Sequence, residues 1–477
     1  MNVFKHLLPN RCGFGNVYFF SVASRISFVH TFANHSVQVH SQEQELVIAL
    51  GSNVGDRLQN FHDALQLMGK SGVNITRHGY LYKTAPAYVT DQPRFLNSAI
   101  RGVTKLGPNE LLRVLKTIEK DIGRTDGIRY GPRPINLDLL FYGKFRIHSD
   151  LLTVSHEKIW ERPFLMAPLM DLLGSVENDA VACWHSFSKY SGGLFESWKK
   201  LGGEPLIGTE ELKRVLPIGN QLWDWSETSV MGVLNLSPDS FSDGGEFQSV
   251  KAAVSQVRLM FGEGADIIDI GAQSACPMAS RISVEEELDR LIPVLEVILG
   301  MPETEKKLIS VDTFYSVVAK EAVSKGAHLV NDVSAGQLDP DMQRVVASLN
   351  VPYVAMHMRV DPSTMQNTEN LQHDNVCKQV ATELYSRISN AELSGIPAWR
   401  IIIDPGIGFS KKIEHNLDTL MGLPTIRSEI VRQSLAMSQA PMLIGPSRKR
   451  FLGEICSHPA SVERDAATIA SVTAGIL

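Results

Sequence analysis

VMGVLNLSPDSFSDGG, residues 230–245, decides the architecture of the second half of this chain. Val230–Leu234 is a short apolar run, and from Asn235 onward the residues are small, polar and turn-forming. A strand that ends in Asn, Asp, Ser and Gly is typical of the first strand in an α/β active-site unit. The segment therefore predicts a buried strand followed by a functional loop.

The same design recurs six more times downstream. The expected strands are Val230–Leu234, Asp266–Ile270, Leu308–Val311, His328–Val333, Val351–His357, Arg400–Ile403 and Met442–Ile444. Helical spacing of apolar residues occupies the intervals, over Val250–Phe261, Val284–Ile298, Tyr315–Ser324, Asn375–Leu393 and Glu463–Ile476. Repeated βα units favour a TIM-type barrel over residues 229–477. A doubly wound sheet is the alternative, and it is disfavoured because no glycine-rich dinucleotide motif follows the first strand.

Polar residues follow the carboxyl ends of these strands: Asn235, Asp312, Asn331, His357, Asp404 and the triplet Ser447-Arg448-Lys449. Each one alone reads as a cap or turn residue. Together, at equivalent strand ends, they are expected to face one mouth. The acceptors at Asp312, Asn331 and Asp404 suit a ring with many N–H donors, such as a pterin. Lys449 suits an anion or a ring carbonyl, and Asn235 suits a metal-bound phosphate.

Residues 43–175 have a different pattern, with the element order β-α-β-β-α-β. Expected strands are Leu46–Leu50, Asn74–Thr84, Phe95–Lys105 and Ile135–Tyr142, and expected helices are Asp56–Ser71 and Pro108–Ile122. This order predicts a ferredoxin-like domain. Its last part gathers arginines beside one or two acids, at Arg124, Arg129, Arg133, Asn136, Asp138, His156 and Arg162. Such a set suits a nucleoside triphosphate with Mg²⁺, although a solvated arginine-rich loop fits the composition equally well.

The remaining segments bear on location and linkage. Residues 1–42 contain no Asp or Glu but contain Lys5, Arg11 and Arg25, which is typical of an organellar transit peptide; a disordered tail is the alternative. Residues 176–228 read as an ordered linker, with a short helix near Thr209–Val215 and three tryptophans that pack on one neighbour.

Composition excludes several classes. A length of 477 residues accommodates two or three domains, and a net charge of −6 argues against nucleic acid as the main partner. Five scattered cysteines indicate a reducing compartment and no zinc site. No window approaches the roughly 20 apolar residues of a membrane span.

Several motifs of the first domain resemble hydroxymethyldihydropterin pyrophosphokinases: GSN (51–53), YKTAP (82–86), DQPRFLN (91–97), GRTDGIRYGPRPINLDLLFYG (123–143) and TVSH (153–156). The resemblance implies pyrophosphate transfer from ATP to a reduced pterin, with Mg²⁺ as cofactor. It places the pterin on Thr84, Phe95, Asn97 and Phe164. It places ATP on Glu119, Arg124, Arg133, His156 and Arg162. It places metal on Asn136 and Asp138, with Arg133 and Asp138 as catalytic residues.

The second domain resembles dihydropteroate synthases through MGVLNLSPDSFSDGG, IIDIG, ISVDTF, NDVSAG, MHM, IDPGIGFSK and LIGPSRKRFLG. The resemblance implies coupling of a pterin diphosphate to p-aminobenzoate. Asp312, Asn331, Asp404 and Lys449 would bind the pterin, with Asp404 and Lys449 catalytic. Asn235 would bind metal, and Phe241, Pro277 and Ser447 would border the aminobenzoate pocket. The fusion is similar to the mitochondrial bifunctional folate enzymes of plants. This resemblance implies that the protein is located in the mitochondrial matrix and that its partners are small-molecule substrates. It is also compatible with a homo-oligomer formed through the barrel.

Four departures from these families predict altered activity. Asn136 replaces an aspartate, which predicts a kinase rate lower by about 10²-fold because Mg²⁺ prefers anionic oxygen. Ala275 and Cys276 replace a threonine and an arginine near the diphosphate. Val360 stands where glycine is usual, which predicts strain if the backbone has positive φ there. The fourth departure is in the fold: we expect a (β/α)8 barrel that lacks its eighth βα unit. The alternative interpretation of the function is a degenerate paralogue that binds pterin or ATP with one or both activities lost.

Overall fold

The computed structural model describes residues 42–125, 127–156, 158–175, 178–188, 190–237, 249–274, 280–458 and 460–476. The predicted transit peptide lies outside the described residues except for Gln42. Much of the loop after the first barrel strand, including Phe241, also lies outside them, as do Ala275, Cys276 and Pro277.

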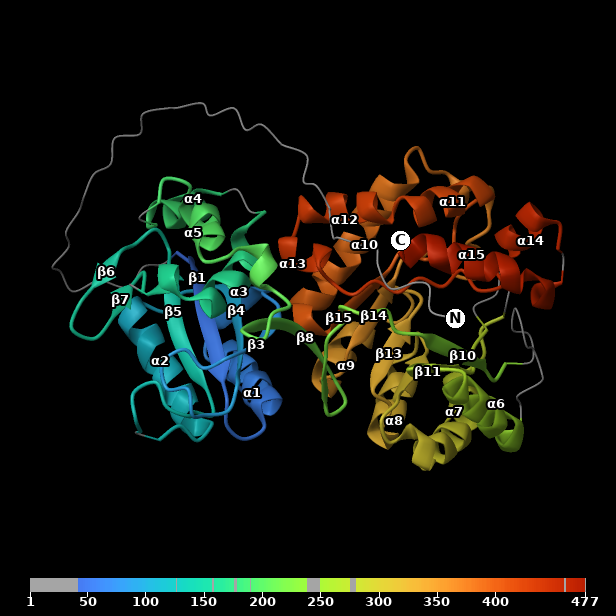
Figure 1. Ribbon diagram of the computed structural model, residues 1–477, viewed down its shortest axis with the longest axis horizontal. Helices are drawn as coiled ribbons and strands as arrows, with labels where there is room; N and C mark the ends of the chain where they lie inside the picture. Colours follow the sequence, from blue (N-terminus) through green and yellow to red (C-terminus); the bar gives the residue numbers. More distant parts are fainter. Residues whose placement is uncertain are drawn as a thin grey trace, which may run out of the picture. The chain divides into compact units, whose positions relative to one another are not determined.

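The N-terminal domain is built on an antiparallel sheet with the order β5-β1-β4-β3, and β2 pairs with β4 beside this path. Its strands are β1 (Gln44–Ser52), β2 (Val73–His78), β3 (Leu81–Thr84), β4 (Phe95–Thr104) and β5 (Asn136–Tyr142). Helices α1 (Arg57–Lys70) and α2 (Pro108–Asp121) pack beside each other and against β1 and β5 (Figure 1). The ferredoxin-like order is confirmed, with one difference in the second strand.

The single strand predicted over Asn74–Thr84 is wrong, because it is divided into β2 and β3 at Gly79. A Cβ added at Gly79 would lie 2.9 Å from the carbonyl oxygen of Pro168, so only glycine fits this close approach. Just after the break, the buried Asp171 carboxylate accepts hydrogen bonds from the Tyr80 backbone N–H and the Tyr82 hydroxyl, both at 2.8 Å. Tertiary contacts with one helix therefore interrupt an otherwise continuous apolar pattern.

That helix is α3 (Pro163–Leu173), and it begins a helical layer that continues beyond residue 175. The layer contains α4 (Asp179–Ser186) and α5 (Gly193–Lys200), with the short elements β6 (Ile147–His148), β7 (Thr153–Val154), η1 (Ile159–Glu161) and η2 (Glu204–Leu206) nearby. Trp184 of α4 is fully buried and stacks on Phe141 with ring centroids 5.1 Å apart. This half of the predicted linker therefore packs on the N-terminal domain.

The helix predicted near Thr209–Val215 is wrong: the chain forms strand β8 (Leu212–Ile218) and turns into β9 (Gln221–Trp223). β8 pairs antiparallel with β3 and so extends the first sheet. Trp223 instead packs in a cluster with barrel residues such as Leu308, Leu329 and Ile402. Packing of the tryptophans on a single neighbour is therefore also wrong, whereas the boundaries 176 and 228 stay a prediction.

The C-terminal domain has a six-stranded parallel sheet of consecutive strands. The strands are β10 (Met231–Asn235), β11 (Ile267–Gly271), β12 (Leu308–Asp312), β13 (Leu329–Asp332), β14 (Tyr353–Met356) and β15 (Ile401–Asp404). The strand predicted at Met442–Ile444 is present as a single parallel bridge between Met442 and Ile403. In the described part of the chain β10 pairs only with β11, and the predicted lack of an eighth unit stays a prediction.

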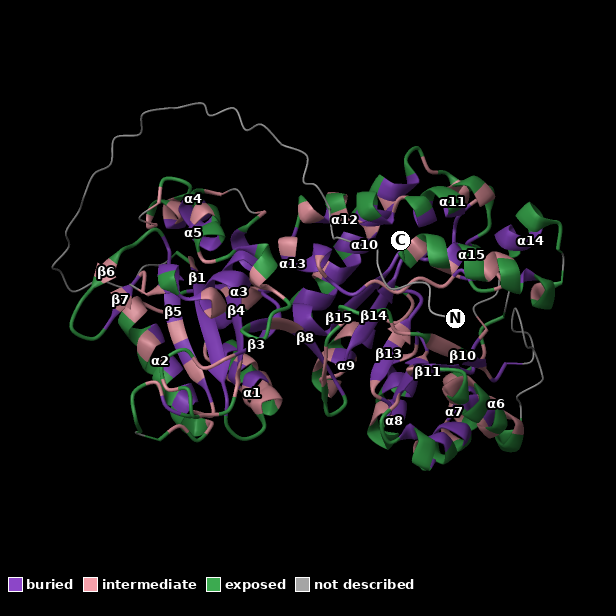
Figure 2. Ribbon diagram, viewed as in Figure 1, coloured by how far each residue is buried: buried purple, intermediate pink, exposed green. Residues whose placement is uncertain are grey.

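Helices cover the outside of this sheet, and α6, α7, α8 and α9 pack in succession (Figure 1). They are α6 (Val250–Gly262), α7 (Val284–Leu299), α8 (Ser316–Lys325), α9 (Met342–Leu349), α10 (Val376–Leu393), α11 (Ile413–Met421), α12 (Leu423–Val431), α13 (Leu435–Ser438), α14 (Arg450–Cys456) and α15 (Asp465–Ile476). Short 3-10 turns are η3 (Pro302–Thr304), η4 (Thr368–Leu371), η5 (Ala398–Arg400) and η6 (Ser461–Arg464). Figure 2 shows buried residues concentrated in the strands and exposed ones on the outer helix faces. Among the described residues, no helix combines the length and apolarity needed to cross a membrane.

Candidate functional sites

A cavity of about 480 Å³ lies in the N-terminal domain, within the usual range of ligand pockets. It brings together eleven residues predicted from the sequence: Thr84, Phe95, Asn97, Arg124, Arg129, Arg133, Asn136, Asp138, His156, Arg162 and Phe164. They come from β3, β4, β5, the loop between α2 and β5, and the start of α3 with the loop before it, so their proximity depends on the sheet order. The cavity joins a polar, arginine-rich part to an aromatic part.

The inner wall of the cavity carries a buried pair of hydrogen-bonding side chains. The Asn97 amide donates to the Thr84 hydroxyl at 2.7 Å, and both side chains are buried. Gly51 makes room for this pair, because a Cβ there would lie 2.9 Å from Asn97 Oδ1. Phe95 lies beside them, and the guanidinium of Arg133 lies over its ring at 5.9 Å.

Asn136 is held in one orientation by its neighbours. Its amide oxygen accepts from Arg124 at 2.8 Å and from Arg133 at 3.5 Å, and its amide nitrogen donates to Asp138 at 2.6 Å. The neutral amide thus bridges two cations and one carboxylate. Burial, followed by the charge of Arg124, lowers the pKa of the Arg133 guanidinium, which stays protonated at physiological pH.

Glu119 is not one of the residues that line the cavity. Its carboxylate is almost fully buried and accepts from Lys116 at 2.8 Å, from Arg124 at 2.7 Å and from the Leu137 backbone N–H at 2.7 Å. Glu119 therefore fixes the position of the Arg124 side chain without itself lining the cavity. Its predicted contact with ATP stays a prediction.

The sequence reasoning missed an aromatic and cationic cluster at the outer part of the cavity. Tyr88 and Tyr130 stack with centroids 4.4 Å apart, and Arg162 donates to the Tyr88 hydroxyl at 3.0 Å. Lys158 lies 5.5 Å from the Tyr88 ring centroid and 5.6 Å from that of Tyr130. The signal available in the sequence was one tyrosine in the proline-containing loop 85–94 and another in the loop 123–135, which is rich in Gly and Arg.

In the C-terminal domain, strand register aligns several predicted residues at one end of the sheet. Asn235 is opposite Gly271, Gly271 is opposite Asp312, and Asp312 is opposite Asn331. Asp404 ends β15, opposite Met356 of β14. The predicted convergence at the carboxyl ends of the strands is therefore observed for Asn235, Asp312, Asn331 and Asp404.

Buried acids surround this row. Asn331 donates to Asp269 Oδ2 at 2.8 Å, and Asp269 is 3% exposed. Burial, then the charges of Asp269 and Glu287, raise the pKa of Asp312 well above its ordinary value, while Lys449 opposes the shift. Asp269 and Glu287 were missed in the sequence reasoning. Asp269 could have been found as the single charged residue inside the apolar strand IIDIG.

Lys449 supplies the positive charge in this mouth. Its ammonium group donates to the Ile407 carbonyl and lies 4.4 Å from the Phe409 ring centroid. Burial lowers the pKa of Lys449 to about 8, against the raising effect of Asp404 and Asp312. Asp404 is itself 6% exposed and accepts from the Gly406 N–H at 2.7 Å.

His357, which follows β14, is fully buried. Its Nε2 is 3.0 Å from Glu383 and its Nδ1 is 3.1 Å from the buried Lys411 ammonium. Burial, then the charge of Lys411, lower the pKa of His357 to about 3, so the imidazole is neutral. Since an ammonium can only donate, Nδ1 accepts and Nε2–H donates to Glu383.

Two other predicted features have mixed outcomes. Ser447 is exposed, in the loop before α14, and its role beside the aminobenzoate stays a prediction. Val360 has φ 57°, so the condition under which the sequence predicted backbone strain at this position is met. Within the described ranges, no group of three or more His, Cys, Asp or Glu residues is arranged to hold a metal ion.

Comparison with known protein families matches both halves of the chain. Residues 47–174 match the model for 7,8-dihydro-6-hydroxymethylpterin-pyrophosphokinase, and residues 231–477 match the model for pterin binding enzymes. The mitochondrial folate synthesis bifunctional protein of Pisum sativum is 71% identical over 453 residues, covering 94% of this chain and 88% of that protein. The chain belongs to the bifunctional folate synthesis family.

Further relatives of this family agree in extent and fold. The mitochondrial folate synthesis bifunctional protein of Arabidopsis thaliana is 66% identical, over 94% of this chain and 82% of its own length. The crystal structure of Plasmodium falciparum HPPK-DHPS with pteroate superposes with a TM-score of 0.68 at 21% identity, covering 91% of this chain and 94% of that one. The structural likeness supports the same two-domain fold. These matches do not favour the degenerate paralogue considered above.

Proposed function

We propose that the chain carries out two consecutive steps of folate synthesis, pyrophosphorylation of a reduced hydroxymethylpterin and its condensation with p-aminobenzoate. The observation that supports this most strongly is the cavity of the N-terminal domain, where the Thr84–Asn97 pair meets the arginines around Asn136. Membership of the bifunctional family supports the second step as well. The chain is accordingly a transferase with two active sites.

In the first step, the pterin hydroxymethyl oxygen attacks the β-phosphorus of ATP. An O–P bond forms, the bond from that phosphorus to the α–β bridging oxygen breaks, AMP leaves and the hydroxyl proton is lost to solvent. Arg124, Arg133 and Arg162 would neutralise phosphate oxygens, because their forks fit phosphate geometry. Thr84 and Asn97 would bind the pterin edge, between the rings of Phe95 and Phe164.

Asp138 and the Asn136 amide would hold Mg²⁺ together with oxygens of the nucleotide phosphates. This donor set fits the ion, which is commonly held by one or two carboxylates plus substrate phosphates. The metal would supply charge neutralisation of the triphosphate. Asn136 contributes one neutral oxygen, and at present that oxygen accepts from Arg124.

In the second step, the amine of p-aminobenzoate attacks the pterin methylene carbon. A C–N bond forms, the C–O bond to the diphosphate breaks, pyrophosphate leaves and the amine gives up a proton. Asp312, Asn331 and Asp404 would accept from the pterin N–H groups, and Lys449 would hold a ring carbonyl or nitrogen. Asn235 would bind the departing diphosphate with its metal.

Separate assays of the two steps test the proposal on the full chain. We expect Asp138→Asn to abolish AMP formation and leave condensation of a supplied pterin diphosphate intact. We expect Asp312→Asn to have the opposite pattern. If wild-type chain of verified fold lacked both activities, or if either variant impaired both steps equally, the assignment of the two sites would be wrong.

For location, we propose the mitochondrion. Two relatives in the family are named mitochondrial proteins, and residues 1–42 have the composition of a transit peptide. Fusion of residues 1–42 to a fluorescent protein in plant cells provides the measurement. Import into mitochondria is expected, and diffuse cytosolic fluorescence would contradict it.

A further inference from the structure

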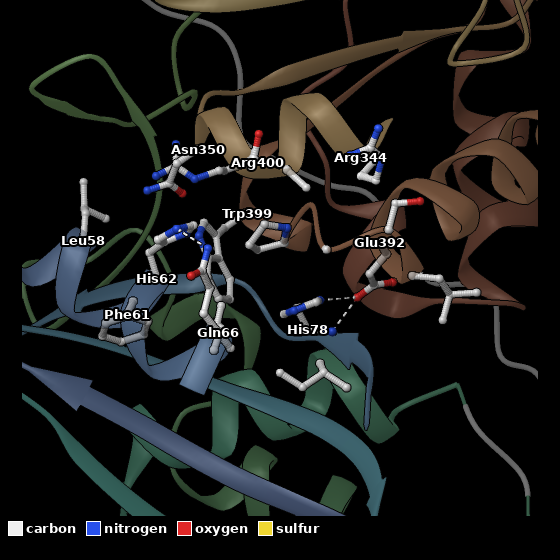
Figure 3. A pocket seen from close by; sticks show the side chains of 18 residues that line it. Leu58, Phe61, His62, Gln66, His78, Arg344, Asn350, Glu392, Trp399 and Arg400 are labelled. Atoms are coloured by element: carbon white, nitrogen blue, oxygen red, sulfur yellow. Dashed lines mark hydrogen bonds and ion pairs between the residues drawn. The ribbon is translucent and has the colours of Figure 1, made fainter. Parts of the chain in front are cut away.

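A second cavity, of about 320 Å³, lies where the N-terminal domain meets the barrel. None of the residues that line it belongs to either candidate active site. Helix α1 and strand β2 form one wall, and α9, the end of α10 and η5 form the other (Figure 3). Its lining combines apolar side chains, among them Phe61 and Trp399, with the polar groups of His62, Gln66 and Asn350. The volume is at the lower end of that of small-ligand pockets.

Firm contacts across the two domains hold this cavity open. Glu392 of α10 forms an ion pair with Arg77 at 3.1 Å and also lies 3.1 Å from His78 Nδ1. Trp399 meets Phe61 edge-to-face at 6.1 Å and His78 at 5.6 Å. Glu392 is the one acidic residue among those that line the cavity, and its charge is already neutralised by Arg77. It lies on the side of the cavity away from Arg400 (Figure 3).

Arg400 is the unusual group of the cavity. It is 6% exposed, and among the described residues its guanidinium has no hydrogen-bond or ion-pair partner. Another buried arginine of the barrel, Arg387, donates to the carbonyls of Met356 and Met358. A buried cation without such partners carries an uncompensated desolvation cost, which an anion at hydrogen-bond distance would offset.

The groups around Arg400 fit an anionic head. Figure 3 shows His62, Asn350 and Arg400 gathered on one side of the cavity, and His62 Nε2 lies 2.8 Å from the Gln66 amide nitrogen. Burial, and to a smaller extent the charge of Arg400, lower the pKa of His62, whereas Asp63 raises it. The guanidinium of Arg400 and the polar side chains of His62 and Asn350 therefore face the same part of the cavity.

We propose that this interdomain cavity binds a small organic anion, with its phosphate or carboxylate on Arg400 and an apolar body against Phe61 and Trp399. The guanidinium fork binds either head group through two parallel hydrogen bonds. The volume accommodates a one-ring compound, and the apolar walls favour a ring over an inorganic ion. Because both domains line the site, an occupant stabilises their contact. The inference does not depend on the proposed function, since none of the catalytic residues takes part.

Histidine-detected NMR of the full chain tests the proposal directly. With ¹³C-labelled histidine, the His62 signal is assigned by its loss in His62→Gln. We expect phenyl phosphate, benzoate or both to shift that signal saturably, and neutral benzamide at the same concentration to leave it unmoved. Which anion acts identifies the head group. An unmoved His62 signal at about 10 mM of both anions, or an equal shift with benzamide, would overturn the inference.

Variants then attribute the binding to Arg400. Arg400→Met is expected to weaken anion binding about 10-fold or more, because a charge-assisted hydrogen bond is lost, and Arg400→Lys is expected to retain much of it. Arg432→Met is the matched control, since Arg432 is 71% exposed and pairs with Glu429. Equal affinity in Arg400→Met and wild type would refute the role of Arg400. If Arg400→Met does not fold, the wild-type titration against benzamide still decides.

Discussion

Replacing Asn136 with aspartate is the most informative perturbation of the pyrophosphokinase site. The change restores the second carboxylate of the metal pair and leaves the side-chain volume almost unchanged. In the present structure Asn136 donates to Asp138 at 2.6 Å, so it does not present a free pair of oxygens to a cation. Its amide oxygen already accepts from Arg124 at 2.8 Å.

The expected magnitude follows from charge. A hard dication prefers anionic oxygen, and we expect Asn136→Asp to raise the pyrophosphokinase rate about 10²-fold, or about 3 kcal/mol of barrier. The Mg²⁺ concentration at half-maximal rate should fall as well. Without metal, Asp138 repels the new carboxylate, whereas Arg124 and Arg133 attract it, so the stability of the metal-free variant should stay close to that of wild type.

The assay is AMP release by the full chain over a Mg²⁺ titration, with Asn74→Asp as the control. Asn74 is exposed on β2, so this change adds the same charge away from the cavity. Equal rates and equal Mg²⁺ dependence for wild type and Asn136→Asp would refute the reasoning. That outcome would mean that Asp138 and the substrate phosphates suffice to hold the metal.

Three further predictions concern both domains. Gly51→Ala should raise the KM for the pterin about 10-fold, because the new Cβ would lie 2.9 Å from Asn97 Oδ1. Gly69→Ala is the control: its Cβ would meet no atom within 4 Å, and the KM should stay unchanged. Synthase kcat/KM should fall above pH 8, because Lys449, with a pKa of about 8, loses its charge there. Lys449→Arg should move this fall to higher pH. A pH profile of the variant that matches the wild-type profile would contradict the role of Lys449. Burial raises the pKa of Glu287 to about 7, so stability present at low pH is lost as the pH rises through about 7. In denaturation at pH 8.5, Glu287→Gln should therefore be more stable than wild type by up to about 3 kcal/mol, with little difference at pH 5; equal stability at both values would refute the shift.

Prediction from sequence succeeded where one local pattern carries the information. Six of the barrel strands and five of the ten helices described in that domain were predicted, because short apolar runs followed by polar turns can be recognised in the chain itself. The strand-end residues Asp312 and Asp404 followed from the same pattern. Parallel strands expose their carboxyl ends on one side, so position in the strand already implies a common mouth.

Prediction failed where the partner of a segment is distant in sequence. The segment Leu212–Ile218 has no strong strand pattern, and it becomes a strand because β3 offers an edge to pair with. The run over Asn74–Thr84 divides at Gly79 because Pro168 passes against its backbone. Propensity summed over a short window cannot register either contact.

The sequence by itself determined the family, the two catalytic domains and the residue types at both sites, because these reside in contiguous motifs such as VMGVLNLSPDSFSDGG. Only the tertiary structure decided how those residues are engaged. It showed Asn136 held between Arg124 and Asp138, and Arg400 buried between two domains with no partner for its guanidinium in the described part of the chain. Burial and the neighbours of a charge depend on segments hundreds of residues apart, and these set its free energy.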